Sequence, residues 1–291
     1  MIKQLTKGLI FTVVATLPFS AHAHRAWLLP STTVLSGDTP WVTVDAAVSN
    51  DLFYFEHVPL VLEGVAALPA QNSSNNARAR PSNRLVITAP DGTEVPAQNG
   101  HVGKYRSVFD VELAQKGTYK LAVASTGRYL AHYTEKGEKR RWMGTPDQLA
   151  HAIPDDAENV QVSEVDSRME LFITSGNPTD SVFQTTGKGL EMKPVTHPND
   201  LFAGETSEFI FLLDGKPAAG AQVTVIPGGI RHRDQLNDIK LTADANGKVS
   251  IPWPSAGFWW MEATVVQKEG LSEPVDQRRS VYTSTLEVMA P

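Results

Sequence analysis

The sequence contains no cysteine among its 291 residues. This absence excludes disulfide scaffolds, thiolate zinc sites, iron–sulfur clusters and cysteine nucleophiles. It also excludes a lipid anchor attached to an N-terminal cysteine. Any metal that the protein holds is therefore expected to use nitrogen and oxygen ligands.

Positive charge is also scarce. The chain has 26 Lys and Arg residues against 32 Asp and Glu residues, so its formal net charge is -6. A nucleic-acid partner would require a basic face for its phosphates, so none is expected. Common catalytic motifs are missing too: the sequence has no G-x-S-x-G, no H-E-x-x-H, no Walker loop and no G-x-G-x-x-G after a strand. The sequence therefore favours a non-enzymatic protein.

Long apolar runs are confined to the start of the chain. Lys3 and Lys7 precede an apolar run at 8–19, and a small-residue motif that signal peptidases recognise ends at Ala23. This run is shorter than the roughly 20 residues that cross a bilayer. We predict a secretory signal peptide at 1–23, cleaved after Ala23, export to a Gram-negative periplasm, and no membrane span in the mature chain. Cleavage would leave 268 residues with a net charge of -8.

After the first 23 residues, helical periodicity is scarce and alternating strand patterns recur. These runs are rich in β-branched and aromatic residues. They lie at 41–46, 85–88, 119–123, 208–213 and 222–226. The turn dipeptides Asp91-Gly92, Asp214-Gly215 and Asn246-Gly247 lie between such runs, because glycine accepts the positive φ of a tight hairpin. Short strands at this spacing predict an all-β protein with two β-sandwich, Ig-like domains.

The stretch between the two halves has a different composition. Residues 128–160 are charged and lack a clear period, apart from one short helical segment with Thr145 as N-cap and Pro146 as its first residue. The predicted organisation is an N-terminal β-sandwich at 24–130, an irregular connection with a short helix at 131–185, and a C-terminal Ig-like β-sandwich at 186–291.

Histidine supplies the main candidates for a binding site. After cleavage, His24 becomes the first residue, and its α-amine and imidazole can together chelate a divalent transition metal such as copper or nickel. Further ligands must come from elsewhere in the chain, and we expect them at His57, the neighbouring Glu56 and His132. The alternative is that His24 is only the residue that follows the cleavage site.

Three consecutive aromatic residues precede Glu56. Phe53, Tyr54 and Phe55 cannot all face one side of a strand, so at least one of them should project outward. An exposed aromatic beside Asp51 and Glu56 suits a ligand or a protein partner. Most other aromatics are expected to fill the sandwich cores.

Three segments carry a resemblance to known families. Residues 24–31 (HRAWLLPS) resemble the A-H-x-F/W-W/L-x-P opening of a periplasmic family formerly described as a NikM-like nickel- or cobalt-uptake component and later as a domain of unknown function. Residues 189–198 (GLEMKPVTHP) resemble that family's G-L-E-I-x-P-L-T-x-P junction. The G-x-P-x-x-G-A-x-V at 215–223 resembles a carboxypeptidase-regulatory-like, Ig-like module. Only His24 maps onto the family's opening as a site residue.

The resemblance implies a periplasmic accessory protein for transition-metal uptake. It would bind nickel, cobalt or copper, a metal complex, or a partner such as an uptake transporter or a TonB-dependent receptor. A second interpretation is an envelope protein–protein interaction module without a metal, docking through edge strands and exposed aromatics. A third is an oxidative enzyme with copper held by the N-terminal histidine.

Overall fold

The computed structural model describes residues 24–65 and 83–291. The predicted signal peptide at 1–23 lies outside these residues. The described chain consists of twenty β-strands, one α-helix and two short 3-10 helices, which confirms the all-β prediction. None of its helices is long and apolar enough to cross a membrane.

The strands form three sheets. The first has the order β1 (Arg25–Pro30), β3 (Trp41–Ser49), β9 (Ser107–Glu112), β8 (Gln98–Val102), with β4 (Val58–Pro59) beside β3. The second has the order β17 (Ile239–Thr242), β16 (Gln222–Pro227), β19 (Gly257–Gln267), β20 (Gln277–Val288), β12 (Glu158–Ser175), β10 (Gly117–Glu135), β6 (Asn83–Thr88), β5 (Leu62–Glu63), with β2 (Val34–Leu35), β7 (Glu94–Val95) and β11 (Glu138–Gly144) at its sides. The third contains β13 (Leu190–Pro194), β14 (Thr206–Leu213), β15 (Lys216–Pro217) and β18 (Lys248–Pro252).

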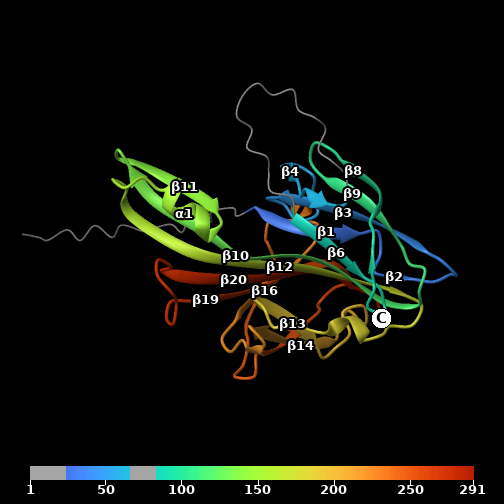
Figure 1. Ribbon diagram of the computed structural model, residues 1–291. Helices are drawn as coiled ribbons and strands as arrows, with labels where there is room; N and C mark the ends of the chain where they lie inside the picture. Colours follow the sequence, from blue (N-terminus) through green and yellow to red (C-terminus); the bar gives the residue numbers. More distant parts are fainter. Residues whose placement is uncertain (1–23, 66–82) are drawn as a thin grey trace, which may run out of the picture.

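The second sheet is a central layer that both sandwiches share. Figure 1 shows the long strands β10, β12 and β20 in the middle, with the first sheet on one side and β13 and β14 on the other. β12 serves both sides because successive side chains of a strand point to opposite faces. Its Leu171 and Ile173 enter the core beneath the first sheet, whereas Phe172 enters the core beneath the third.

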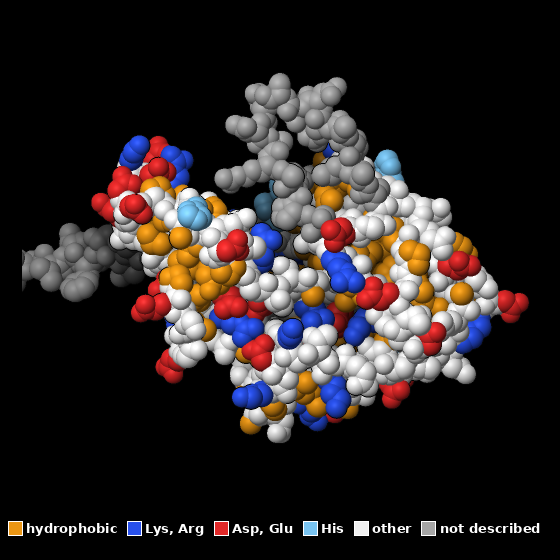
Figure 2. Space-filling model, in the orientation of Figure 1, with side chains coloured by type: hydrophobic (Ala, Val, Ile, Leu, Met, Phe, Trp, Pro, Cys, Tyr) orange, Lys and Arg blue, Asp and Glu red, His pale blue; other side chains and the backbone are white. Residues whose placement is uncertain are grey.

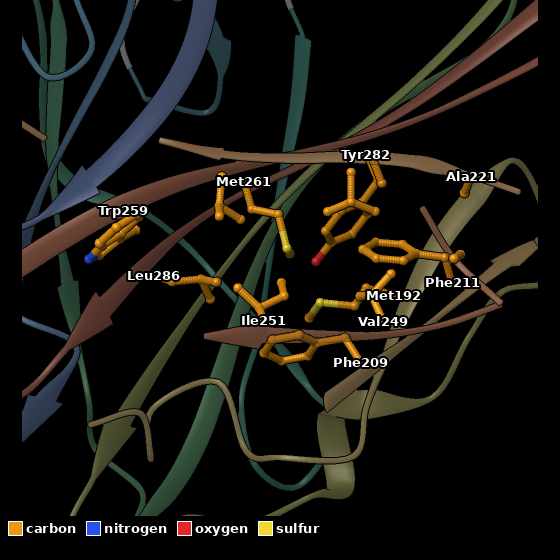
Figure 3. Close-up of a cluster of buried hydrophobic side chains, with 14 of the residues drawn as sticks. Met192, Phe209, Phe211, Ala221, Val249, Ile251, Trp259, Met261, Tyr282 and Leu286 are labelled. Atoms are coloured by element: carbon orange, nitrogen blue, oxygen red, sulfur yellow. The ribbon is translucent and has the colours of Figure 1, made fainter. Parts of the chain in front are cut away.

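The core on the C-terminal side is built from aromatic and aliphatic side chains of facing strands. Figure 3 shows Phe209 and Phe211 of β14 packed toward Met261 of β19 and Tyr282 of β20. All four side chains are buried. The alternation of buried and exposed residues along β14 is the pattern that predicted this strand from sequence.

The prediction of an irregular connection at 131–185 is wrong for most of this stretch, because most of it is strand. β10 continues to Glu135, β11 pairs with it, and β12 returns from Glu158. Together they form a projecting arm that ends in a hairpin (Figure 1). The expected helix is present as α1 (Pro146–Ala152), where the Gln148 side chain accepts a hydrogen bond of 3.2 Å from the Thr145 amide.

The charged composition of the arm explains why it looked like a linker. A strand shows an alternating pattern in the sequence only where one of its faces is buried. Few residues of the arm are buried: Ala131 and Val162 are, but no residue of α1 is. Lys, Arg, Asp and Glu side chains mix at the end of the arm (Figure 2). The boundary expected after residue 130 falls inside β10, and the division into domains remains a prediction.

His197 lies where the third sheet meets the start of β10. Its Nδ1 accepts a hydrogen bond of 3.1 Å from the Asn199 amide, and its Nε2 lies 3.0 Å from the Thr118 hydroxyl and 3.3 Å from the Thr179 carbonyl oxygen. The Asn199 contact requires an unprotonated Nδ1, so the ring is neutral here. Burial lowers the pKa of His197 below its ordinary value, opposed by the Thr179 hydrogen bond.

This lowered pKa predicts an acid-sensitive stability. The unfolded chain binds a proton at His197 below about pH 6.5, whereas the folded protein resists it, so stability falls as the pH drops below that value. In His197→Asn the amide oxygen can accept the Asn199 hydrogen bond without titrating. We expect urea unfolding between pH 7.5 and pH 5 to be less pH-dependent in this variant, and an unchanged slope would contradict the assignment.

Candidate functional site

The start of β1 lies across the outer face of β16 and β19. Trp259 and Met261 point into the C-terminal core, so the intervening Trp260 points to the opposite face. There its Nε1 donates a hydrogen bond of 3.2 Å to the carbonyl oxygen of Ala26. The guanidinium carbon of Arg25 lies 5.7 Å from the centre of the Trp260 ring. These contacts fix the chain directly after His24 against the C-terminal half.

A small hydrophobic cluster completes this junction. Trp27, Ala47 and Leu52 from the N-terminal half pack with Ile226 and Trp260 from the C-terminal half. The Trp27 indole also donates a hydrogen bond of 2.8 Å to the Ser49 hydroxyl, which donates one of 2.6 Å to the Asp51 carbonyl. Trp27 thereby ties β1 to the loop that follows β3.

That loop contains the three consecutive aromatics. Phe53 has a φ of 62° and packs with Trp27 and Phe258, and Phe55 also contacts Trp27. Tyr54 is 42% exposed, which confirms that one aromatic projects outward. The guanidinium carbon of Arg231 lies 3.8 Å from the centre of its ring. The loop therefore bridges the two halves with its flanking aromatics and exposes the central one.

The same loop brings His57 to His24. The two imidazole rings stack with 3.9 Å between their centroids and 16° between their planes. Both residues are exposed. Two of the four predicted ligands, distant in the sequence, thus lie in direct contact at the start of β1.

The other two predicted ligands are placed differently. Glu56 Oε1 accepts hydrogen bonds from the amides of Asn50 and Asp51, at 2.9 and 3.1 Å, so this oxygen stabilises the loop. His132 lies on the arm, exposed, opposite Arg141 in β11. Within residues 24–65 and 83–291, no group of three or more His, Asp or Glu side chains is arranged to hold a metal ion. The described side chains thus bring two of the predicted ligands together, the imidazoles of His24 and His57.

Beside this histidine pair, a cleft of about 630 Å³ opens between the two halves. The outer face of β16, β17 and β19 forms its floor, which includes the half-buried Thr224 and Glu262. One wall contains His24, Arg25 and Asp51. The opposite wall is the loop after the 3-10 helix η2 (Ile230–His232). The cleft thus lies over the part of this sheet face that β1 does not cover.

Arg233 holds the second wall in shape. Its guanidinium donates hydrogen bonds to the carbonyl oxygens of Pro227, Gln235 and Leu236, at 2.6, 2.9 and 2.9 Å, and to that of Gly228. These acceptors lie at the end of β16 and in the segment that follows it. Arg233 therefore builds the wall, and its donors are already engaged.

Glu262 occupies the middle of the floor. Its Oε1 lies 4.0 Å from an Arg279 nitrogen, a long separation for an ion pair. Burial raises the pKa of the Glu262 carboxyl above its ordinary value, opposed by the charges of Arg279 and Arg25. Sequence reasoning missed this residue. The available signal was its place between Trp260 and Thr264 on one face of an alternating strand.

The comparisons with known proteins concern the whole chain. A family model described as "Domain of unknown function (DUF4198)" matches residues 21–267. No curated protein matches the sequence. The solved structure described as "D0-D1 domain of Intimin" is similar over 90% of this chain and 97% of its own, with 12% identity and a TM-score of 0.20. That score is too low to support any inference.

Proposed function

The chain belongs to the DUF4198 family, and from this premise we propose that it is an exported, non-enzymatic protein that binds a divalent transition metal through His24 and His57. One observation carries the proposal: the two imidazole rings lie 3.9 Å apart at the start of the described chain. Neither ring is enclosed by the protein, since both residues are exposed.

The further donor that we propose, besides the two imidazoles, is the α-amine of His24. Once the chain begins at His24, its amine and ring Nδ1 form a chelating pair, and a ring nitrogen of His57 is a third donor. Imidazole and amine nitrogens suit copper, nickel and zinc. Imidazole lone pairs lie in the ring plane, so the parallel rings must turn about their Cβ–Cγ bonds before both face one ion. Their exposure leaves room for this rotation.

We further propose that the protein acts in the periplasm as an accessory to nickel, cobalt or copper uptake. The signal-peptide pattern of residues 1–23 supports the location, and the N-terminal amine that cleavage would create supports the metal. The partner would then be an uptake transporter or a TonB-dependent receptor. That partner would receive the metal from an open site, since three nitrogen donors leave coordination positions free.

The arm favours a second function, an envelope interaction module without a metal. Met143 and Val160 are exposed on it, and α1 buries no residue. The arm contributes few buried side chains to either core. Binding to a partner therefore explains its exposed apolar residues better than a contribution to stability does. Loss of partner binding after deletion of the arm tip, in a protein that binds no metal, would favour this function.

The metal proposal predicts a thermal shift that depends on the first residue. Protein that begins at His24 should gain thermal stability with copper, nickel or cobalt, because a ligand that binds only the folded state raises the melting temperature. One additional residue before His24 removes the free α-amine, and His57→Ala removes the second ring. We expect each change to weaken metal binding by about tenfold or more, measured by calorimetry.

The matched control is His101→Ala. His101 is an exposed histidine on β8, outside the stacked pair, so its removal should leave the affinity unchanged. Equal affinities for the native and the extended N-terminus would refute the α-amine as a ligand. Oxygen- or peroxide-dependent turnover by copper-loaded protein would refute the non-enzymatic part of the proposal.

A further inference from the structure

The cleft beside the histidine pair is lined by both acidic and basic side chains. Several of its charged groups are already engaged: Arg233 bonds to loop carbonyls, and Lys240 pairs with Asp238 at 3.1 Å. Among the residues that the structure describes, the nearest charged partners of Glu262 and Arg279 are each other, with 4.0 Å between their nearest charged atoms. The Glu262 carboxylate and the Arg279 guanidinium therefore face the cleft without a short ion pair between them, and the carboxylate of Asp234 adds a further negative charge to its lining.

Arg25 adds a second cation on the opposite wall. One guanidinium nitrogen donates a hydrogen bond of 3.1 Å to the Asn50 carbonyl. The remaining donors of this planar group are available to a carboxylate, for which Arg geometry is well suited. Arg25 and Glu262 line the same cleft, and the Arg25 charge opposes the rise in the pKa of the Glu262 carboxyl. A central carboxylate thus lies within the influence of two guanidiniums.

We propose that this cleft binds a small zwitterion of the amino-acid or short-peptide class, with its ammonium group on Glu262 and its carboxylate on Arg279 or Arg25. A ligand with only one sign of charge would leave part of this set unpaired. The volume of about 630 Å³ lies within the range of small-molecule sites and accommodates a short peptide. This site requires no metal and goes beyond the proposed function.

Calorimetry with metal-free protein in chelator tests the proposal. The probes are alanine, dialanine, trialanine, and dialanine with an acetylated N-terminus and an amidated C-terminus. We expect at least one of the free zwitterions to bind at millimolar concentration or below and the capped peptide not to bind. The preferred length distinguishes an amino-acid site from a peptide site. Absence of binding by all three zwitterions, or equal binding of the capped peptide, would overturn the proposal.

Substitutions in the floor locate the site. Glu262→Gln and Arg279→Gln should each weaken zwitterion binding by about tenfold or more, because each removes one charge partner. Glu269→Gln, an exposed change in the loop between β19 and β20, is the matched control and should have no effect. The same affinity in Glu262→Gln and the unaltered protein would overturn the assignment.

Glu262→Gln is expected to fold, so a loss of ligand affinity in this variant would not result from unfolding. Burial of the charged carboxylate is unfavourable, so its neutral isostere should equal or exceed the unaltered protein in stability at pH 7. Ligand affinity should therefore fall, whereas thermal stability should stay unchanged or rise. A purely structural glutamate would lose stability instead. Metal affinity measured in the same variant reports on His24 and His57 separately.

Discussion

Trp27→Ala is expected to lower the free energy of unfolding by about 3–5 kcal/mol, the range for removal of a buried tryptophan. Trp27 is fully buried and belongs to the cluster that joins β1 and the loop after β3 to Ile226 and Trp260. The substitution leaves a cavity at the junction of the two halves and deprives the Ser49 hydroxyl of its indole donor. Urea unfolding followed by intrinsic fluorescence measures the loss.

The same substitution should weaken metal binding, because Trp27 fixes the strand that places His24 and the loop that places His57. Trp41→Ala is the matched control. Trp41 lies on the neighbouring strand β3 but is 44% exposed, so its removal should cost no more than about 0.5 kcal/mol. Similar losses for the two tryptophans would show that Trp27 does not anchor the junction.

Arg278→Met is the second change expected to have a large effect, about 3–5 kcal/mol, because it leaves a buried carboxylate without its partner. The Nε of Arg278 donates a hydrogen bond of 2.7 Å to Asp166 on the adjacent, parallel strand β12. Asp166 is buried. A second donor of Arg278 reaches Asp214, 3.1 Å away, in the turn between β14 and β15. One guanidinium thus connects the central sheet to the third sheet.

The pairing predicts a partial rescue. In Arg278→Met/Asp166→Asn the buried charge is gone, while the Asn oxygen can still accept the hydrogen bond that the Gly127 amide donates to Asp166 at 2.8 Å. We expect the double variant to be more stable than Arg278→Met alone. Arg84→Met is the control, because Arg84 pairs with Glu94 at 3.2 Å in an exposed ion pair worth at most about 1 kcal/mol. Equal losses at Arg278 and Arg84 would contradict the role of burial.

The fold class was predictable because the sandwich strands bury one face. Runs such as 119–123 and 208–213 alternate in the sequence and lie in β10 and β14. The arm was not predictable as strand, since both of its faces are largely open to solvent and charged residues occupy them. The backbone hydrogen bonds of the arm form between β10 and the strands β11 and β12. This pairing needs no buried face, so the sequence of the arm shows no apolar period.

The candidate site was partly predictable. Residue chemistry pointed to His24 and His57, and the structure places them in contact. It places His132 on the arm, and its role as a ligand stays a prediction. The cleft and Glu262 were not predictable, because a glutamate on the outer face of a strand is ordinary in a sequence. Its significance depends on Arg279 of the neighbouring strand β20 and on Arg25 of β1, which is distant in the sequence.

The sequence by itself determined that this is an all-β protein, that no metal can be held by cysteine thiolates, and that one of three neighbouring aromatics is exposed. These properties are local, because strand period, residue type and side-chain direction are set within a few residues. Only the tertiary structure decided that both sandwiches share one central sheet and that β1 covers part of its outer face. Strand period shows which residues share a face, but only long-range pairing determines which sheet covers that face and which part is left open as a cleft.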